Sequence, residues 1–178
     1  GVTRNGEAFI DSAISAGARV VLTGGEAAAT LHSGAVLIRL PDLPALAGHL
    51  ASRFFGNPSH AMTVVGVTGT NGKTSVTHFI AQLAGSMGIP SAVVGTLGWG
   101  FLGALQDTGH TTPGAVVLQR ILWRLCRDGC RLVAIEVSSH ALDQYRVDGI
   151  RFAVAVLTNI PQDHLDYHQT MARYSEAK

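Results

Sequence analysis

The stretch at residues 64–75 reads Val-Val-Gly-Val-Thr-Gly-Thr-Asn-Gly-Lys-Thr-Ser. Short apolar residues lead into a glycine-rich turn, and a lysine and two hydroxyl side chains follow it. This order predicts a strand, a phosphate-binding loop and a helix, because loop N–H groups and a helix N-terminus attract anions. Lys73 would then contact the β- and γ-phosphates of a nucleotide, and Thr74 would coordinate Mg²⁺.

The spacing of this loop departs from the strict Walker form, in which a glycine and four further residues precede Gly-Lys-Ser/Thr. That form requires glycine at position 67, where the chain has Val67. A glycine-rich turn with an unrelated lysine is the alternative interpretation. The flanks favour the phosphate loop, because residues 62–67 are strand-like and residues 74–87 repeat apolar side chains at helical spacing. The predicted apolar face of this helix consists of Val76, Phe79, Ile80, Leu83, Ala84 and Met87.

The composition is that of a globular chain with a substantial core. Of 178 residues, 47% are hydrophobic and 14% are charged, which argues against disorder. The net charge of +1 gives no electrostatic reason to expect nucleic acid or an anionic membrane as partner. Neither a membrane span nor a signal peptide is recognisable. We expect a cytoplasmic protein in which Cys126 and Cys130 are reduced, and we expect it to be a monomer.

The alternation of patterns predicts two α/β parts with a boundary after residue 58. Residues 1–58 show strand patterns at 19–22 and 35–40 and helix patterns near 9–14 and after Asp42. In residues 59–178 we predict strands at 62–67, 91–95, 131–137 and 152–158, and helices at 74–87 and 114–128. The last two strands are almost continuously apolar, as in parallel strands covered on both faces. The fold class is therefore α/β, with a doubly wound, mostly parallel sheet and a P-loop.

Polar residues gather where these strands end, which is where ligands bind in such sheets. Glu136 stands at the end of an apolar strand, where a carboxylate is costly unless it is paired or bound to a metal. A Mg²⁺ ion shared with Thr74 would remove that cost. The alternative is a glutamate at a strand end that faces solvent.

Residues 159–168 contain two histidines and two aspartates within six positions. A transition-metal site is one interpretation, but a Mg²⁺ or positioning role for one histidine is simpler beside the predicted phosphates. Asp166 and His168 are equally compatible with loop and cap roles. We predict a glycine- and threonine-rich loop between residues 96 and 113, at the end of which Thr111, Thr112 and Pro113 suit either a helix start or an anion contact.

Taken together, these segments resemble the Mur ligases, ATP-dependent amino-acid ligases of peptidoglycan synthesis. The loop at 69–74 has the family form Gly-Thr-Asn-Gly-Lys-Thr, which also explains its departure from the Walker spacing. The other motifs that carry the resemblance are Thr111-Thr112-Pro113, Glu136-Val-Ser-Ser-His-Ala-Leu142 with Gln144 and Arg146, Thr158-Asn159, Asp163-His-Leu-Asp-Tyr-His168 and the run at 171–178. The likeness is strong over 59–178 and weak over 1–58, and it is greatest to the branch that adds a diamino acid.

The resemblance implies a set of roles for individual residues. ATP would lie on Gly69, Thr70, Asn71, Gly72, Lys73, Thr74 and Ser75. The UDP-muramoyl dipeptide would lie on Thr111, Thr112, Ser138, Gln144, Arg146 and His110, which stands where some relatives have asparagine. Thr74 and Glu136 would hold one Mg²⁺, while His164 and a carbamylated Lys178 would serve a second. A carbamate makes physical sense there, because it turns a cation into a carboxylate-like ligand for a hard metal.

The reaction implied by the resemblance is the addition of meso-diaminopimelate or L-lysine to UDP-N-acetylmuramoyl-L-alanyl-D-glutamate through an acyl phosphate. The resemblance also implies that residues 1–58 are the end of a UDP-binding domain and that 59–178 begin an ATP-binding central domain. We therefore expect residues 1–178 alone not to catalyse ligation. Two alternatives remain: a folylpolyglutamate- or cyanophycin-synthetase-like ligase, and a nucleotide-binding module without catalysis.

Overall fold

A computed structural model describes residues 6–160 and 169–176 of the chain. The chain divides into two compact units, Gly1–Leu46 and Ala47–Lys178, and the division falls inside helix α2 (Leu43–Phe54). The predicted domain boundary after residue 58 stays a prediction. None of the helices in the described ranges is long and apolar enough to cross a membrane.

The first unit is a small three-stranded sheet with short helices. Its elements are η1 (Gly6–Phe9), α1 (Ile10–Ser15), β1 (Val20–Gly24), β2 (Ala28–His32) and β3 (Ala35–Leu40). The strand order is β1-β3-β2, with β1 parallel and β2 antiparallel to β3. Strand β2 was not predicted, because its alanines have low β-propensity and all five of its residues are exposed, which removes the alternating pattern.

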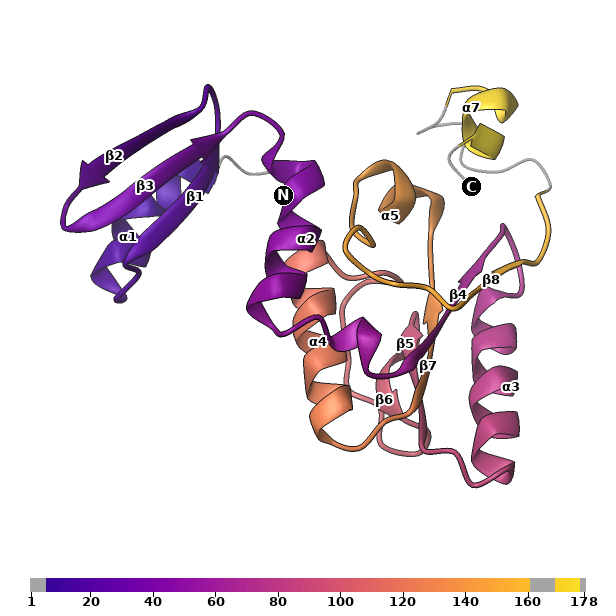
Figure 1. The fold of residues 1–178 in the computed structure, drawn as a ribbon. Coiled ribbons are helices and arrows are strands. Elements are labelled where there is room, and N and C mark those ends of the chain that lie inside the picture. Colours follow the sequence, from indigo (N-terminus) through magenta and orange to yellow (C-terminus); the bar gives the residue numbers. More distant parts are fainter. Residues whose placement is uncertain (1–5, 161–168, 177–178) are drawn as a thin grey trace. The chain divides into compact units, whose positions relative to one another are not determined.

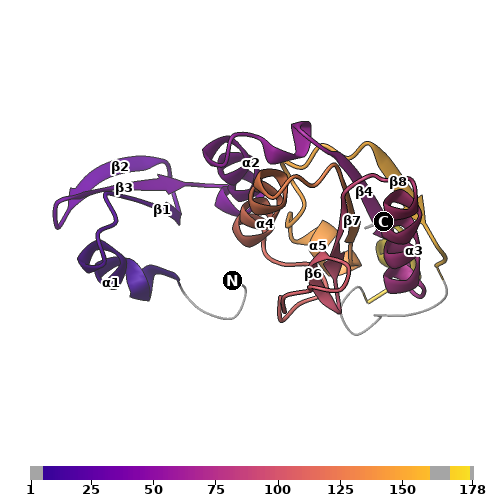
Figure 2. The same cartoon turned by 90° about the horizontal axis from the view of Figure 1, so that it is seen from below.

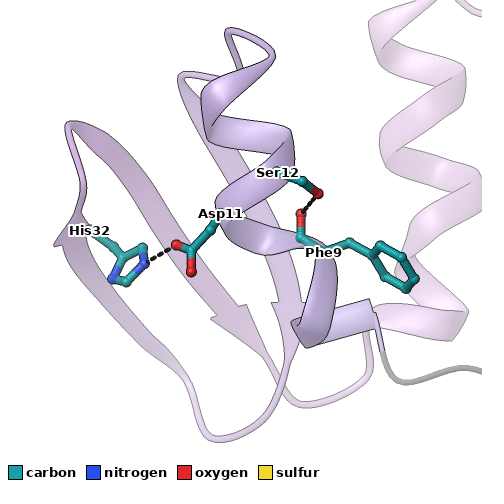
Figure 3. Close-up of polar contacts among 4 residues, drawn as sticks. All are labelled: Phe9, Asp11, Ser12 and His32. Atoms are coloured by element: carbon teal, nitrogen blue, oxygen red, sulfur yellow. Dashed lines mark hydrogen bonds and ion pairs between the residues drawn. The ribbon is translucent and has the colours of Figure 1, made fainter.

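A side-chain contact joins this edge strand to the helix of the same unit. His32 Nε2 lies 2.8 Å from Asp11 Oδ1, and Figure 3 shows the two side chains meeting between β2 and α1. Ser12 Oγ donates to the backbone carbonyl of Phe9 at 2.9 Å, near the start of the helix. Both members of the His32–Asp11 pair are largely exposed, so water screens their attraction and the contact adds little stability.

The second unit is a five-stranded sheet between helices (Figures 1 and 2). Its elements after α2 are η2 (Pro58–His60), β4 (Thr63–Thr68), α3 (Lys73–Ser86), β5 (Ser91–Gly95), β6 (Gly98–Phe101), α4 (Ala115–Arg127), β7 (Leu132–Glu136), α5 (Ser139–Asp143), β8 (Val154–Leu157) and α7 (Met171–Glu176). The strand order is β6-β5-β7-β4-β8, and all neighbours are parallel except β5 and β6. The predicted α/β class is confirmed.

The core of this unit lies between the sheet and α4, on the face opposite α3 (Figure 1). Leu118 and Leu122 of α4 are fully buried, as are Val133 and Ile135 of β7. Strand β7 is central because it has β5 on one side and β4 on the other, so its apolar run is covered as predicted. This arrangement fixes the carboxyl end of β7, where Glu136 lies, in the middle of the sheet.

Two sequence expectations about burial were wrong. Strand β8 was predicted to be covered on both faces, but it pairs only with β4 among the described strands, and Val154 and Leu157 are about half exposed. The large residues Phe79, Leu83 and Met87 of the predicted apolar face of α3 keep more than half of their surface exposed, whereas Ala84 of that face is buried. The helix faces inward with small residues (Thr77, Ala81 and Ala84). Small side chains let a helix approach a sheet closely, and hydrophobic periodicity gives no sign of that.

Strand β6 lies in the segment that we predicted to be a loop between residues 96 and 113. It pairs antiparallel with β5, and Gly98 and Gly100 within it pack against the backbone of residues 104–106. Both glycines have a positive φ, which other residues rarely adopt. The glycines that suggested a loop therefore make room for a tight β-ribbon at the edge of the sheet.

The two cysteines are not joined to each other, in agreement with the sequence prediction. Cys130 is 2% exposed, and its Sγ donates to the carbonyl of Leu132 at 3.0 Å. Burial raises the pKa of the Cys130 thiol from 9.0 to about 11. The folded state therefore holds this proton more tightly than the unfolded chain does. The stability that the buried neutral thiol contributes is complete below pH 9 and is lost as the pH rises through about 11.

We predict that iodoacetamide leaves Cys130 unmodified in the native protein near neutral pH and modifies it in denaturant. The thiolate is the form that reacts, and burial both suppresses its formation and blocks access. Peptide mass spectrometry after timed alkylation would measure the modification of Cys130 separately from that of Cys126. Equal rates in native and denatured protein would contradict the burial of this thiol.

Candidate functional site

The residues of the site meet at the carboxyl ends of four strands. The phosphate loop follows β4, Thr96 follows β5, Glu136 ends β7, and Asn159 follows β8. These ends lie together near the top of the sheet in Figure 1. Parallel strands bring residues from distant parts of the chain to one edge, which is why ligands bind there in such folds.

The loop at 69–75 is held in shape by the segment after β8. Asn159 Oδ1 accepts from the Asn71 backbone N–H at 3.0 Å, while its Nδ2 donates to the Asn71 carbonyl at 3.1 Å. The Thr70 backbone N–H donates to the Asn159 carbonyl at 2.9 Å, and Thr158 Oγ1 donates to the Asn71 carbonyl at 2.7 Å. These four bonds fix the shape of the loop through contacts within the protein itself.

Gly69 has no room for a side chain. A Cβ atom built on Gly69 would lie 1.9 Å from Thr158 Oγ1, and the residue has a φ of +135°. The glycine is therefore required both by its backbone conformation and by the close approach of Thr158.

We predict that Gly69→Ala destabilises the protein by about 2–4 kcal/mol and weakens nucleotide binding, because the loop must move or Thr158 must leave its place. Gly103→Ala is the matched control, since Gly103 also has a positive φ but open space around it. It is expected to cost about 1–2 kcal/mol of backbone strain and to leave nucleotide binding unchanged. Urea unfolding and calorimetric titration would measure the two effects, and equal losses of stability would contradict the steric argument.

Lys73 is the first residue of α3 and points its ammonium group back into the loop. Its Nζ donates to the carbonyls of Gly69 at 2.9 Å and Thr70 at 2.8 Å. Gly72, just before it, has a φ of +85°, which turns the chain into the helix. The cation, the loop backbone and the helix N-terminus therefore converge, as the phosphate-loop interpretation expects.

Glu136 is 1% exposed, and its carboxylate accepts bonds from two threonines. Thr74 Oγ1 donates to Oε2 at 2.9 Å, and the Thr96 backbone N–H donates to Oε1 at 3.0 Å. Gly95 leaves space for this carboxylate, because a Cβ atom there would lie 2.1 Å from Oε1. The alternative of a solvent-facing glutamate is therefore wrong.

Among the described residues, Glu136 has only neutral hydrogen-bond donors, so its negative charge is buried without a cation. Carboxylate and hydroxyl oxygens are ligands that Mg²⁺ prefers. Glu136 and Thr74 therefore fit a magnesium ion. Within the described part of the chain, no group of three or more His, Cys, Asp or Glu residues could hold a metal ion.

The Thr-Thr-Pro segment is attached to the end of β7. Thr112 Oγ1 donates to the Glu136 carbonyl at 2.7 Å and accepts from the Ser138 backbone N–H at 3.1 Å. Arg146 Nη1 donates to the Thr112 carbonyl at 3.0 Å, while Arg146 Nη2 donates to Gln144 Oε1 at 2.6 Å. Four of the predicted substrate residues thus form one connected network.

Ser138 has a second role in this part of the site, and Thr111 and His110 lie beside the network. Ser138 caps α5, since its Oγ accepts from the Ala141 backbone N–H at 3.2 Å. Thr111 lies beside Thr96, with 3.0 Å between the two hydroxyl oxygens. His110 is exposed, and its backbone N–H donates to Thr108 Oγ1 at 3.1 Å. Its ring makes no hydrogen bond to the other described substrate residues, so its predicted role has the least structural support.

Two predicted catalytic residues, His164 and Lys178, lie outside the described residues, as do Asp163, Asp166 and His168. The helix α7 before Lys178 is described, and its Tyr174 is fully buried. Tyr174 OH lies 2.6 Å from Thr70 Oγ1, so α7 contacts the phosphate loop.

Sequence reasoning missed Tyr174 and Thr96. Thr96 stands directly after a strand, and that position was the only available signal.

A hollow of about 750 Å³ lies at the opposite end of the sheet, around the amino ends of β4, β7 and β8. Its lining includes His60, Arg131, Arg151 and Phe152. It contains none of the predicted site residues. We therefore place the site by the convergence of the loop, Lys73 and Glu136 rather than by the size of a hollow.

Comparison with known proteins identifies the family. Residues 67–178 match the Mur ligase middle domain, and the chain therefore belongs to the Mur ligase family. A protein of Alkalilimnicola ehrlichii named UDP-N-acetylmuramoyl-L-alanyl-D-glutamate--2,6-diaminopimelate ligase is 50% identical over 187 residues, which cover 100% of this chain and 38% of the relative. A protein of the same name from Pseudomonas syringae pv. tomato is 49% identical over 179 residues, which cover 100% of this chain and 37% of that relative.

Solved structures support the same family. A structure of a protein with that same ligase name superposes with a TM-score of 0.81 at 34% identity, over 96% of this chain and 34% of that chain. A crystal structure of MurF from Acinetobacter baumannii superposes at 0.63 with 17% identity, over 100% of this chain and 35% of that chain, which supports the fold alone. The chain spans little more than a third of the length of the curated relatives that it matches.

Proposed function

We propose that this chain is part of an ATP-dependent ligase that joins 2,6-diaminopimelate to UDP-N-acetylmuramoyl-L-alanyl-D-glutamate, in peptidoglycan synthesis. The observation that carries the proposal is the contact of Thr74 with the buried Glu136 beside Lys73 and the phosphate loop. The names of relatives at about 50% identity support diaminopimelate as the amine. L-Lysine is the other amine that the sequence left open.

We infer that ATP lies on residues 69–75, with Lys73 at its terminal phosphates. Thr74 and Glu136 would hold a Mg²⁺ ion, which supplies positive charge to the phosphate oxygens. The network of Thr112, Ser138, Gln144 and Arg146, with Thr111 and His110 beside it, would bind the UDP-muramoyl substrate. A second metal on His164 and a carbamylated Lys178 stays a prediction from the family resemblance.

The proposed chemistry has two steps. A γ-carboxylate oxygen of the D-glutamyl residue attacks the γ-phosphorus of ATP, the bond to ADP breaks, and an acyl phosphate forms. The amine then attacks the acyl carbon, phosphate leaves, and the amine loses a proton as the amide forms. Lys73 and the loop N–H groups would stabilise the charge on the transferring phosphoryl group, and water must be kept from the acyl phosphate.

The test is ADP release by the full-length protein with ATP, Mg²⁺ and UDP-N-acetylmuramoyl-L-alanyl-D-glutamate. Parallel reactions would contain meso-diaminopimelate, L-lysine or no amine. Release that depends on diaminopimelate is the expected result, and release that depends on L-lysine would change the proposed amine. ATP binding without amine-dependent release would overturn the proposal, and it would favour a folate- or cyanophycin-type ligase or a non-catalytic module.

A further inference from the structure

Thr96, the first residue after β5, contacts both oxygens of the Glu136 carboxylate. Its backbone N–H donates to Oε1 at 3.0 Å, and its Oγ1 lies 3.2 Å from Oε2. Thr96 is exposed, whereas Glu136 is 1% exposed, so the threonine lies on the solvent side of a buried carboxylate. Because the Thr96 side chain is exposed, core packing does not fix its position. Its hydrogen bonds to Glu136 therefore suggest a role at the site.

The Thr96 hydroxyl also touches the Thr-Thr-Pro segment. Its Oγ1 lies 3.0 Å from Thr111 Oγ1. A hydroxyl has one hydrogen to donate, and an ionised carboxylate can only accept. The Thr96 hydroxyl is the donor in both contacts, so its single hydrogen is shared between Thr111 Oγ1 and Glu136 Oε2. The result is a chain of hydrogen bonds from the proposed substrate segment to the proposed metal ligand.

Thr96 and Gly95 together restrict the orientation of this carboxylate. Gly95 leaves the space that Oε1 occupies, and Thr96 contacts Oε1 with its backbone N–H and Oε2 with its hydroxyl. Thr74, which would also coordinate the metal, donates to Oε2 from the start of α3. A carboxylate that is fixed before the metal arrives loses less freedom on binding it, and such supporting residues tune metal affinity.

We propose that Thr96 is a positioning residue that fixes Glu136 for its metal ion and couples it to Thr111. The proposal rests on the proposed function, because it takes Glu136 as a magnesium ligand. Every variant at position 96 except proline keeps the backbone N–H that donates to Glu136. A substitution there therefore tests only the hydroxyl, which contacts both Glu136 and Thr111. Serine at this position keeps that hydroxyl, and valine removes it with little change in shape.

The experiment measures Mn²⁺ binding, as a probe for Mg²⁺, to the full-length protein in the presence of a non-hydrolysable ATP analogue. Electron paramagnetic resonance reports the free Mn²⁺ without any need for turnover. Thr96→Val is expected to raise the dissociation constant about 10-fold, while Thr96→Ser keeps the wild-type value. Thr30→Val, at an exposed threonine of β2, is the matched control. Thermal unfolding of each variant would show that the fold is intact.

A double-mutant cycle tests the link to the substrate segment. Thr111→Val is expected to weaken Mn²⁺ binding less than Thr96→Val does, and the double variant is expected to be no weaker than Thr96→Val. Additive effects of the two substitutions would overturn the coupling.

Three outcomes would overturn the positioning role. In the first, Thr96→Val keeps the wild-type affinity while Glu136→Gln loses it, which leaves the proposed metal site standing. In the second, neither variant affects Mn²⁺ binding, which removes the metal site and the positioning role together. In the third, Thr96→Ser binds as weakly as Thr96→Val, which shows that the hydroxyl is not the group that matters.

Discussion

Replacing Lys73 by alanine is expected to lower the rate of amine-dependent ADP release about 10²- to 10³-fold, the range seen when one group that stabilises developing charge is removed. The Lys73 ammonium lies within hydrogen-bond distance of the Gly69 and Thr70 carbonyls, so it is placed at the mouth of the loop. Among the described residues, Lys73 is the only lysine or arginine of α3. Without it, the helix supplies no side-chain ammonium to stabilise the transferring phosphoryl group. The measurement is kcat with saturating ATP and both other substrates.

The control for this prediction is Arg120→Ala, which removes an exposed cation from α4. It is expected to leave kcat and stability unchanged, because surface cations contribute little. A Lys73→Ala protein with normal kcat and a raised KM for ATP would contradict the prediction. That result would mean that the lysine binds the ground state and the transition state equally.

Glu136→Gln is expected to raise the Mg²⁺ concentration for half-maximal rate by more than about 100-fold. Loss of a direct metal ligand is expected to cost more affinity than loss of a residue that only supports a ligand. The amide keeps the size of the carboxylate and one oxygen to accept from Thr74 or Thr96. It removes the negative charge that a hard cation needs. The measurement is the Mg²⁺ concentration for half-maximal rate, together with Mn²⁺ binding in the absence of turnover.

Stability distinguishes the role of Glu136 in metal binding from a structural one. Without metal, Glu136→Gln is expected to be at least as stable as the wild type, because it removes a charge that is buried without a cation among the described residues. With metal and nucleotide, the wild type is expected to gain stability that the variant does not. A large loss of stability in the absence of metal would contradict the assignment and favour a structural glutamate.

The positions of the phosphate loop and Glu136 were predictable because each is a local pattern at the end of a strand, whereas the role of the Thr-Thr-Pro segment was assigned only through the family resemblance. Lys73 and Thr74 follow a strand and start a helix, so their chemistry can be inferred from neighbours in the sequence. The end of β7 was predictable for the same reason, since a carboxylate in an apolar run is conspicuous.

What could not be predicted depends on contacts between distant residues. Thr96 matters because Glu136, which is 40 positions away, lies beside it across two neighbouring strands. Phe79 and Leu83 are exposed because α3 packs against the sheet through its small residues. Hydrophobic periodicity indicated a different face of the helix. Strand β8 looked covered because its sequence is apolar, but its pairing leaves it at an edge of the described sheet.

The bonds that tie Asn71 to Asn159 and Thr158 involve amide and hydroxyl groups that the proposed reaction neither protonates nor displaces. The loop is thus ordered when the chain folds, and the entropy of ordering it is lost once in the lifetime of the molecule. Each incoming nucleotide meets a loop that already has its shape. Release of the product returns the protein to the same state, so successive turnovers begin from one conformation rather than from a search among many.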